Sequence, residues 1–452
     1  MSQINDTICA ISTAPGVGGI AVARVSGPQA IAVVSKLWRG KPLNEIETHT
    51  AHLGTIVDSD GTPLDQAVLV LYRAPGSYTG EDTIELSVHG SRYVQRRLLQ
   101  LLIEAGARLA EAGEYTRRAF AAGNLDLAQA EAVADVIASN SRAAHRIALT
   151  QMRGQYSRRL AHLRQKLVDL AALLELELDF SEEEVEFASR IQLKQTAEEI
   201  RAEVSRLLAS FQSGQAIKDG IPVAIVGLTN AGKSSLLNAL LGDERAIVSN
   251  IPGTTRDTIE ETLEIGEYLF RFIDTAGLRD TVDSIEQIGI DRTRQSIAKA
   301  RIVIVVADST QPFPAELLDQ TAHNAYRIIA LNKIDLTERP NLPNGDAGKI
   351  VKISARTHSG LDTLRNALQN IADQECGQAD EGVLVTNQRH AQALDNALKS
   401  IDRMIDGMNA DLPSDLVAQD QRETLHHLGT ITGTITTPDI LNTIFSRFCV
   451  GK

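Results

Sequence analysis

The sequence contains little cysteine and no long hydrophobic run. Its 452 residues include three cysteines, Cys9, Cys376 and Cys449, which are too few and too widely spaced for a disulfide framework or a zinc site. Met1 is not followed by a charged and then apolar leader, and no apolar stretch is long enough to cross a membrane. We therefore expect a protein of the reducing cytoplasm that neither spans a membrane nor is exported.

Positive charge is also scarce. Lys and Arg number 45 against 58 Asp and Glu, a formal net charge of −13, and such a surface would repel a phosphate backbone unless positive charge were clustered locally. One stretch, 142–166, carries seven Lys/Arg and no acid, whereas 175–186 carries seven acids and no base. The two stretches are interpreted either as solvated helix faces or, for the basic one, as a surface that contacts RNA or protein.

The length exceeds what a single hydrophobic core supports and predicts several domains. In residues 1–118, short apolar strands alternate with two helical segments, which predicts an α+β domain. The Gly16-Val-Gly-Gly19 cluster is predicted to form a tight turn and not an anion cradle, because neither a lysine nor a helix start follows it. The expected strands are Thr7–Ser12, Ile20–Val25, His52–Val57, Ala67–Tyr72 and Thr83–Val88, and the expected helices are Pro28–Leu37 and Arg92–Ala105.

Helical periodicity dominates residues 119–215 and 379–452, which flank a unit, 216–378, that alternates strands with helices. The simplest arrangement is one discontinuous helical domain into which an α/β unit with a mostly parallel sheet is inserted. We expect the helices at 125–141, 143–178, 191–211, 386–408, 414–428 and 438–448, and the strands at 221–227, 259–265, 268–273, 302–307, 327–331 and 350–353.

A phosphate-binding pattern opens the inserted unit. Residues 221–235 read IPVAIVGLTNAGKSS, an apolar strand followed by a glycine-bracketed loop and a helix start. Gly227, Gly232, Lys233 and Ser234 occupy the fixed positions of G-x-x-x-x-G-K-[ST]. In this motif the loop N–H groups converge on phosphate oxygens, the lysine neutralises the β/γ charge and the serine hydroxyl ligates Mg²⁺.

Two further motifs would contact the γ-phosphate. Asp274-Thr-Ala-Gly277 follows an apolar strand, which places the Asp274 carboxylate near the Mg²⁺ shell and the Gly277 N–H within reach of the γ-phosphate. Gly253-Thr-Thr-Arg-Asp257 is a candidate switch loop, with Thr255 as a second Mg²⁺ ligand beside Ser234.

The base is predicted from the ends of two later strands. An aspartate in Asn332-Lys-Ile-Asp335 can accept hydrogen bonds from the N1–H and 2-amino group of guanine, a pair that adenine lacks. Ser354-Ala-Arg356 supplies a backbone donor for the guanine carbonyl. The order of these motifs behind a phosphate loop predicts GTP as the ligand.

The sequence leaves several candidates open for the groups that catalyse GTP hydrolysis. Leu278 stands where many small GTPases carry the glutamine that orients water. Glu286 is the nearest candidate for that role, although a glutamate there also suits the first turn of a helix. Positive charge near the β–γ bridge would come from Arg256 or Arg279, each able instead to pair with a neighbouring aspartate, or from a monovalent cation ligated by the amide oxygen of Asn230.

A resemblance to known proteins extends over essentially the whole chain. The runs GLTNAGKSSLLNALL, GTTRD, DTAGLR, NKID and SAR resemble the TrmE-Era-like GTPases. The runs DTICAISTAPGVGGIAVARVSG, SYTGEDTIELSVHG, GEYTRRAF, LDLAQAEAVADVI and FCVGK narrow the resemblance to the MnmE/TrmE family of tRNA modification GTPases.

The resemblance implies both an architecture and an activity. The architecture comprises a folate-binding N-terminal domain (1–118) that also forms a homodimer, a discontinuous helical domain (119–215 and 379–452) and an inserted Ras-like G domain (216–378). The implied activity is potassium-dependent, dimerisation-activated GTP hydrolysis. With the flavoprotein MnmG, in a heterotetramer, such proteins add an aminomethyl or carboxymethylaminomethyl group to carbon five of the tRNA wobble uridine. The one-carbon unit comes from 5,10-methylene-tetrahydrofolate, of which 5-formyl-tetrahydrofolate is an analogue.

The resemblance also implies functional roles for individual residues of this chain. Glu286 matches the catalytic glutamate and Cys449 the cysteine of the modification step, although Cys449 beside Phe448 also suits core packing. The metal ligands implied are Ser234 and Thr255 for Mg²⁺, and Asn230, Ser249, Ile251 and Thr254 for K⁺. The folate contacts implied are Arg24, Glu85, Asn124 and Lys452. The GTP-binding set is Asn230, Ala231, Gly232, Lys233, Ser234, Ser235, Ser249, Asn250, Ile251, Pro252, Gly253, Thr254, Thr255, Asp274, Thr275, Ala276, Gly277, Asn332, Lys333, Asp335, Ser354, Ala355 and Arg356.

Two positions depart from the family pattern. Thr229 stands where proline usually precedes the asparagine of the phosphate loop, and Asn124 stands where a lysine or arginine is usual, which puts that folate contact in doubt.

Two other function classes remain as alternatives to the modifying enzyme. One is a GTP switch for ribosome assembly, which usually adds an RNA module that this sequence lacks; the other is a scaffold GTPase that only dimerises.

Overall fold

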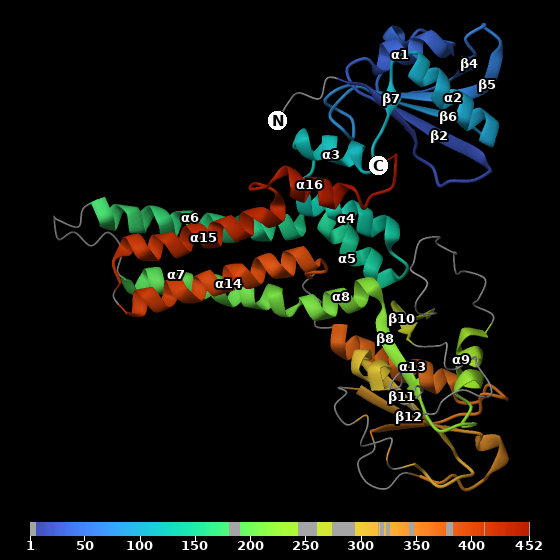
Figure 1. Cartoon of the computed structure of the whole chain (residues 1–452), viewed down its shortest axis with the longest axis vertical. Helices are drawn as coiled ribbons and strands as arrows, with labels where there is room; N and C mark the ends of the chain where they lie inside the picture. Colours follow the sequence, from blue (N-terminus) through green and yellow to red (C-terminus); the bar gives the residue numbers. More distant parts are fainter. Residues whose placement is uncertain are drawn as a thin grey trace. The chain divides into compact units, whose positions relative to one another are not determined.

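The structure is a computed structural model of the whole chain (Figure 1). It describes residues 6–179, 190–242, 260–273, 294–314, 326–342, 348–376, 383–410 and 412–451, together with Glu316 and Thr321. Contacts divide the chain into two units, each of which is described by itself. The first comprises 1–134, 151–168 and 425–452, and the second 135–150 and 169–424.

A seven-stranded sheet in the order β3-β4-β5-β6-β2-β1-β7 forms the centre of the first unit. All neighbouring strands are antiparallel except β1 and β7. The five predicted strands are present, and two short ones, β3 and β7, were not predicted because two residues carry no periodicity. The strands are β1 (Ile8–Ile11), β2 (Gly18–Ser26), β3 (Trp38–Arg39), β4 (Ala51–Val57), β5 (Pro63–Tyr72), β6 (Thr83–Gly90) and β7 (Arg108–Leu109).

Helices α1 (Ala30–Leu37) and α2 (Arg92–Glu104) cover one face of this sheet. Alternate strand residues such as Leu69, Leu71 and Leu86 are fully buried against them. Strand residues between these, including Arg24, Val68 and Glu85, belong to the opposite face because side chains alternate along a strand. Leu53 and Val68, which are register partners, keep 71% and 38% of their surface exposed on that face.

A six-stranded sheet in the order β13-β12-β11-β8-β10-β9 lies in the second unit. It is parallel apart from the β9–β10 hairpin, as the sequence predicts. One face packs on α9 (Lys233–Leu241) and α13 (Leu361–Cys376), and the other buries residues near 297–300. The strands are β8 (Ile221–Val226), β9 (Glu261–Ile265), β10 (Tyr268–Phe272), β11 (Ile302–Asp308), β12 (Tyr326–Asn332) and β13 (Lys349–Lys352).

The long helix predicted over 143–178 is wrong as a single element. Gly154, with a φ of +77° that favours glycine, separates α5 from α6. The helix predicted over 191–211 likewise ends early, and a further helix continues to Asp219. The remaining helices are α3 (Glu114–Ala121), α4 (Leu127–Ala138), α5 (Arg142–Met152), α6 (Gln155–Asp179), α7 (Arg190–Ala209), α8 (Phe211–Asp219), α14 (Gln388–Asn409), α15 (Ser414–Thr432) and α16 (Pro438–Phe445); η1 (Leu43–Glu45) and η3 (Ile334–Leu336) are 3-10 turns.

Helices that precede residues 216–378 in the chain pack on helices that follow this segment. In the second unit α7 lies along α14 (Figure 1). In the first unit Leu127 and Ala130 of α4 share a buried cluster with Ile444 and Phe445 of α16. This pairing of sequence-distant helices is what the insertion of one unit into a discontinuous helical domain requires. Within the described ranges, no helix combines the length and apolar character needed to cross a bilayer.

Candidate functional site

The phosphate loop between β8 and α9 is held in a conformation that needs its glycines. A Cβ on Gly232, where φ is +96°, would lie 2.2 Å from the Asn332 amide nitrogen, and a Cβ on Gly227 would lie 2.3 Å from the Val306 carbonyl oxygen. Asn230 at the loop tip is exposed and has a φ of +62°, which asparagine tolerates better than most residues. The loop between β8 and α9 therefore has the glycine-dependent conformation that a phosphate loop needs, with Asn230 exposed at its tip; the contacts of Asn230 with a ligand stay a prediction.

Lys233 and Ser234 begin α9, so they lie at the positive end of its dipole. The Lys233 ammonium donates to the carbonyls of Gly227 (2.9 Å) and Leu228 (3.0 Å). Burial lowers the pKa of Lys233 from its usual value, because water is removed from the charged form. A phosphate chain would restore the lost solvation of this charge, and the Ser234 hydroxyl beside it fits a hard cation such as Mg²⁺.

The predicted guanine residues form one connected group with the loop. Asn332 is 2% exposed; its amide donates to the Ala231 carbonyl (2.9 Å) and accepts from the Ala355 N–H (3.0 Å). The Ser354 hydroxyl donates to a carboxylate oxygen of Asp335 (2.6 Å) and so fixes its orientation. Residues more than 100 positions apart are thereby joined, and Asp335 is exposed at the carboxyl end of the parallel strands, where ligands bind in such sheets.

Asp308 belongs to this site and was missed by sequence reasoning. It ends β11, and its carboxylate accepts from the Lys333 ammonium at 2.7 Å. Burial opposes ionisation, but hydrogen bonds from Lys333 and Thr310 outweigh it and lower the pKa of Asp308. The only available signal was the Asp-Ser-Thr sequence at the end of an apolar strand, which by itself reads as a turn.

Several predicted residues lie outside the described part of the chain. These are Glu286, Arg256, Arg279 and Lys452, the switch residues Ser249, Asn250, Ile251, Pro252, Gly253, Thr254 and Thr255, and Asp274, Thr275, Ala276 and Gly277. Their roles stay predictions.

The second predicted centre lies in the first unit, on the sheet face opposite α1 and α2, where Tyr115 of α3 packs against β1. Arg24 and Glu85 are register partners on β2 and β6, and two guanidinium nitrogens of Arg24 donate to one Glu85 oxygen at 2.9 and 2.7 Å. The guanidinium carbon lies 5.5 Å from the Tyr115 ring centre and 6.0 Å from that of Tyr78. The predicted pair is thus brought together, and two aromatic rings that the sequence analysis did not single out flank it.

The C-terminal segment runs against the same domain. The Ser12 hydroxyl donates to the Gly451 carbonyl (3.1 Å), and Val450 bridges to Ala112. The Cys449 side chain is exposed and is not core packing. The carboxamide of Asn124 donates to the carbonyls of Ser77 (3.2 Å) and Tyr78 (3.1 Å) and so supports the loop that carries Tyr78. Whether Asn124 also contacts a ligand stays a prediction.

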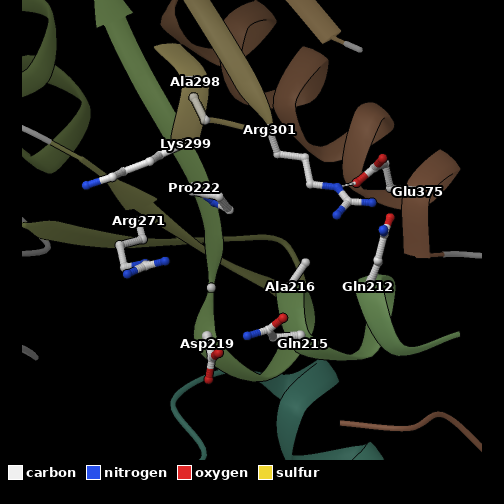
Figure 2. A pocket seen from close by; sticks show the side chains of 12 residues that line it. Gln212, Gln215, Ala216, Asp219, Pro222, Arg271, Ala298, Lys299, Arg301 and Glu375 are labelled. Atoms are coloured by element: carbon white, nitrogen blue, oxygen red, sulfur yellow. Dashed lines mark hydrogen bonds and ion pairs between the residues drawn. The ribbon is translucent and has the colours of Figure 1, made fainter. Parts of the chain in front are cut away.

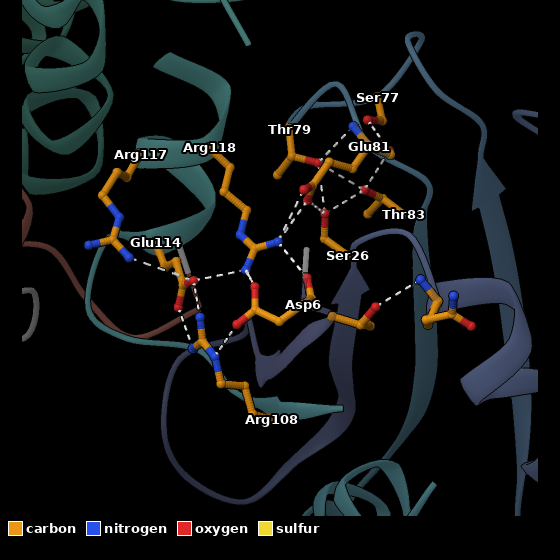
Figure 3. A network of polar contacts seen from close by, with 12 residues as sticks. Asp6, Ser26, Ser77, Thr79, Glu81, Thr83, Arg108, Glu114, Arg117 and Arg118 are labelled. Atoms are coloured by element: carbon orange, nitrogen blue, oxygen red, sulfur yellow. Dashed lines mark hydrogen bonds and ion pairs between the residues drawn. The ribbon is translucent and has the colours of Figure 1, made fainter. Parts of the chain in front are cut away.

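An ionic network, with Arg118 and Glu114 at its buried centre, connects α3 to the loop that carries Tyr78 and Glu81 (Figure 3). Arg118, 2% exposed, donates to Glu81 at 3.1 Å, to the Asp6 side chain at 2.8 Å and to Glu114 at 2.9 Å. Glu114 is fully buried and also accepts from Arg108 at 2.5 and 2.8 Å. Helix α3 also carries Tyr115 and Thr116, and the Thr116 hydroxyl forms a hydrogen bond with the Tyr78 hydroxyl (3.0 Å). The network therefore positions the rings of Tyr115 and Tyr78 beside Arg24.

Removing the Glu114 charge should make the stability of this unit less dependent on pH. Burial raises the pKa of Glu114, but hydrogen bonds from Arg108, the Glu111 N–H and Arg118 outweigh it, so the pKa falls from 4.5 to about 2. The stabilisation, about 3 kcal/mol, is present above pH 4.5 and is lost as the pH falls toward 2. In Glu114→Gln we expect the free energy of unfolding to fall by about that amount at pH 7. The difference from the parent should shrink below pH 4.5.

The single tryptophan, Trp38, is buried in this unit, so its fluorescence reports the unfolding. Glu111→Gln, at a glutamate that is 67% exposed, is the matched control and should change stability little. Equal losses for Glu114→Gln at pH 7 and pH 3 would contradict the assignment.

A polar groove of about 530 Å³ lies in the second unit between α8, β8 and the end of α13 (Figure 2). Pro222 at the start of β8 lines it, and Arg301 forms an ion pair with Glu375 across it. The phosphate loop follows the other end of β8, so the groove is separate from the nucleotide site.

Comparison with known proteins gives matches over nearly the whole chain. The family model described as the MnmE helical domain matches residues 127–449, and the one described as the GTP-binding protein TrmE N-terminus matches residues 7–124. A Parabacteroides distasonis protein is 47% identical, covering 99% of this chain and 100% of that protein. Proteins of Christiangramia forsetii (45%; 100% of both chains) and Cytophaga hutchinsonii (46%; 99% and 98%) are similar. All three bear the name tRNA modification GTPase MnmE.

Proposed function

The chain belongs to the MnmE family of tRNA modification GTPases, and from this premise we propose that it couples potassium-dependent GTP hydrolysis to modification of carbon five of the tRNA wobble uridine. The observation that carries the proposal is the connected group of Ala231, Asn332, Asp335, Ser354 and Ala355. These hydrogen bonds connect Asp335, the proposed guanine-reading carboxylate, to the phosphate loop.

In this proposal the chain's own residues bind and orient GTP. Asp335 accepts the N1–H and 2-amino hydrogens, the Ala355 region donates to the guanine carbonyl, and Lys233 and the loop N–H groups hold the phosphates. Glu286 orients or deprotonates the attacking water. Ser234 and Thr255 would hold Mg²⁺. Asn230, with Ser249, Ile251 and Thr254, would hold K⁺, which would supply positive charge to stabilise the negative charge that develops in the transition state.

The N-terminal centre is proposed to bind 5,10-methylene-tetrahydrofolate, with 5-formyl-tetrahydrofolate as a binding analogue. Support comes from Arg24, a cation held between Glu85 and two aromatic rings, because a folate offers a flat ring system and carboxylates. Cys449 is exposed on a segment that is hydrogen-bonded to the same domain, which supports a role for its thiol in the modification step. Lys452 is proposed as a further contact.

The proposed partners are a second copy of the chain, the flavoprotein MnmG in a heterotetramer, and tRNA, all in the cytoplasm. The exposed apolar side chains of Leu53, Val68 and Ile20, on the sheet face opposite α1 and α2, support dimerisation through the N-terminal domain. Arg153 and Arg158, exposed members of the basic stretch, are candidates for contact with tRNA.

The proposal is tested by nucleoside analysis of tRNA from cells in which the chromosomal gene is deleted. These cells are compared with the same cells supplied with a copy of either the parent gene or the Cys449→Ser variant. A serine hydroxyl is a far weaker nucleophile than a thiolate at neutral pH, so we expect the modified uridine to fall at least about tenfold while GTP turnover of the purified variant stays within about twofold. Ser446→Ala, at a nearby exposed residue, is the matched control.

Full modification in Cys449→Ser would remove the cysteine from the chemistry. Full modification in cells without the gene, with abnormal ribosome profiles, would overturn the proposed function and support the ribosome-assembly alternative.

A further inference from the structure

We propose that the turn of the β9–β10 hairpin and the first turn of α5 form a joint, centred on Glu267 and Arg146, through which the nucleotide state of the GTP site reaches the helical sequence. The inference rests on the proposed function and deepens it by assigning the residues that couple hydrolysis to the rest of the chain. Glu267 and Arg146 touch no nucleotide in this account and act as positioning residues.

Three contacts tie Glu267 to α5. The Ala143 N–H, at the start of the helix, donates to the Glu267 carbonyl at 2.9 Å. The Arg146 guanidinium lies 2.8 Å from one carboxylate oxygen of Glu267, and that of Arg142 lies 3.6 Å from the other. A backbone bond and two ion pairs therefore converge on one residue of a two-residue turn, from a helix about 120 positions away in the sequence.

The other side of the turn is fixed to α13. Gly266, with a φ of +64°, packs so closely on Gln369 that a Cβ would lie 2.7 Å from its side chain. Burial and the carboxylate of Asp373, which accepts a hydrogen bond from Tyr268, raise the pKa of Tyr268 to about 12. The turn is thus clamped between two helices and can transmit a displacement of either strand, because a clamped turn has little freedom to absorb it.

The hairpin lies in the sequence between the two motifs predicted to contact the γ-phosphate. β9 begins at Glu261, shortly after Gly253-Thr-Thr-Arg-Asp257, and β10 ends at Phe272, two positions before Asp274. A rearrangement of either motif on hydrolysis acts directly on a strand of the hairpin. The turn at its far end is the place where that displacement meets another element.

Helix α5 has room to respond. Ala143, Ala144 and Ile147 share one apolar cluster with the parallel sheet, so α5 packs directly on the nucleotide unit. Beside them is a cavity of about 200 Å³, lined by α4, α5, α8 and Thr386, with Ala144 and Ala148 among the lining residues. Small side chains around a void allow a helix to shift between two packings, which a filled interior resists.

Hydrogen exchange of the full chain tests the joint. In the parent, the exchange rate of peptide 142–152 should differ about fivefold between the GDP complex and the complex with a non-hydrolysable GTP analogue, in Mg²⁺ and K⁺. Arg146→Glu should bring that ratio close to one. An ion pair this exposed shifts an equilibrium about fivefold or less, so the variant remains folded. The reversed pair, Arg146→Glu with Glu267→Arg, should restore the ratio.

Arg422→Glu makes the same charge change on an exposed arginine of α15, and it should keep the parent's ratio. Ala148→Val fills part of the cavity and should lower the ratio without altering any charge. A parent ratio of one, in a protein that hydrolyses GTP and modifies tRNA, overturns the joint but not the proposed function. A parent that does neither overturns the proposed function. A reversed pair that fails to restore the ratio overturns the assignment to Glu267.

Discussion

Asp335→Asn is expected to weaken GTP binding by about 10³-fold or more and to strengthen binding of xanthosine triphosphate. In the proposed site the Asp335 carboxylate accepts two hydrogens from guanine. An amide would direct its N–H₂ group at the 2-amino group, which would leave two donors unpaired once the base has displaced water. Xanthine carries a carbonyl at that position, which the new amide can meet. The measurement is the dissociation constant of each nucleotide by competition with a fluorescent analogue.

Ser354→Ala provides a graded control for the same contact. The Ser354 hydroxyl donates to the Asp335 carboxylate at 2.6 Å, so in the proposed site its effect on the base is exerted through that carboxylate. Its loss should reduce GTP affinity by about tenfold, the scale of one hydrogen bond to a charged group, without admitting xanthosine triphosphate. An Asp335→Asn variant that still prefers GTP would show that another residue reads the base.

Asn230→Ala is expected to lower GTP turnover in potassium by about 10²-fold while GTP affinity changes little, because the cation would act on charge that develops only in the transition state. The residue has a φ of +62°, where alanine is strained. Asn230→Gly removes the same side chain without that strain, so it should reproduce the loss. A glycine variant with normal turnover would mean that the alanine acts on loop conformation and not on a cation.

The sequence predicts the parts of this molecule whose geometry is set locally. Gly232 is required because the backbone has a positive φ and meets Asn332, and a phosphate-loop pattern encodes both. Apart from β3 and β7, the strands of both sheets follow from alternating or continuous apolar runs and lie within a few residues of their predicted bounds. Arg24 and Glu85 were located by resemblance alone, because nothing in their spacing of 61 positions indicates that they are register partners.

What the sequence did not reveal depends on contacts between distant residues. The interruption at Gly154 is invisible in the helical pattern, since an isolated glycine also occurs inside helices. Two of the seven cations of the basic stretch, Arg142 and Arg146, contact Glu267, and no charge pattern identifies a partner so far along the chain. No pattern in the sequence distinguishes Arg118 and Glu114 from ordinary surface charges, yet both are buried.

The central claim is that a monovalent cation at Asn230 takes the place of an arginine or glutamine in hydrolysis. The direct measurement is steady-state GTP turnover of the full-length parent at equal ionic strength in potassium and in sodium, with Mg²⁺ constant. The account predicts turnover at least about tenfold faster in potassium, and no cation preference in Asn230→Gly. Equal turnover in both salts by the parent, with a large loss in Arg256→Ala or Arg279→Ala, would contradict it.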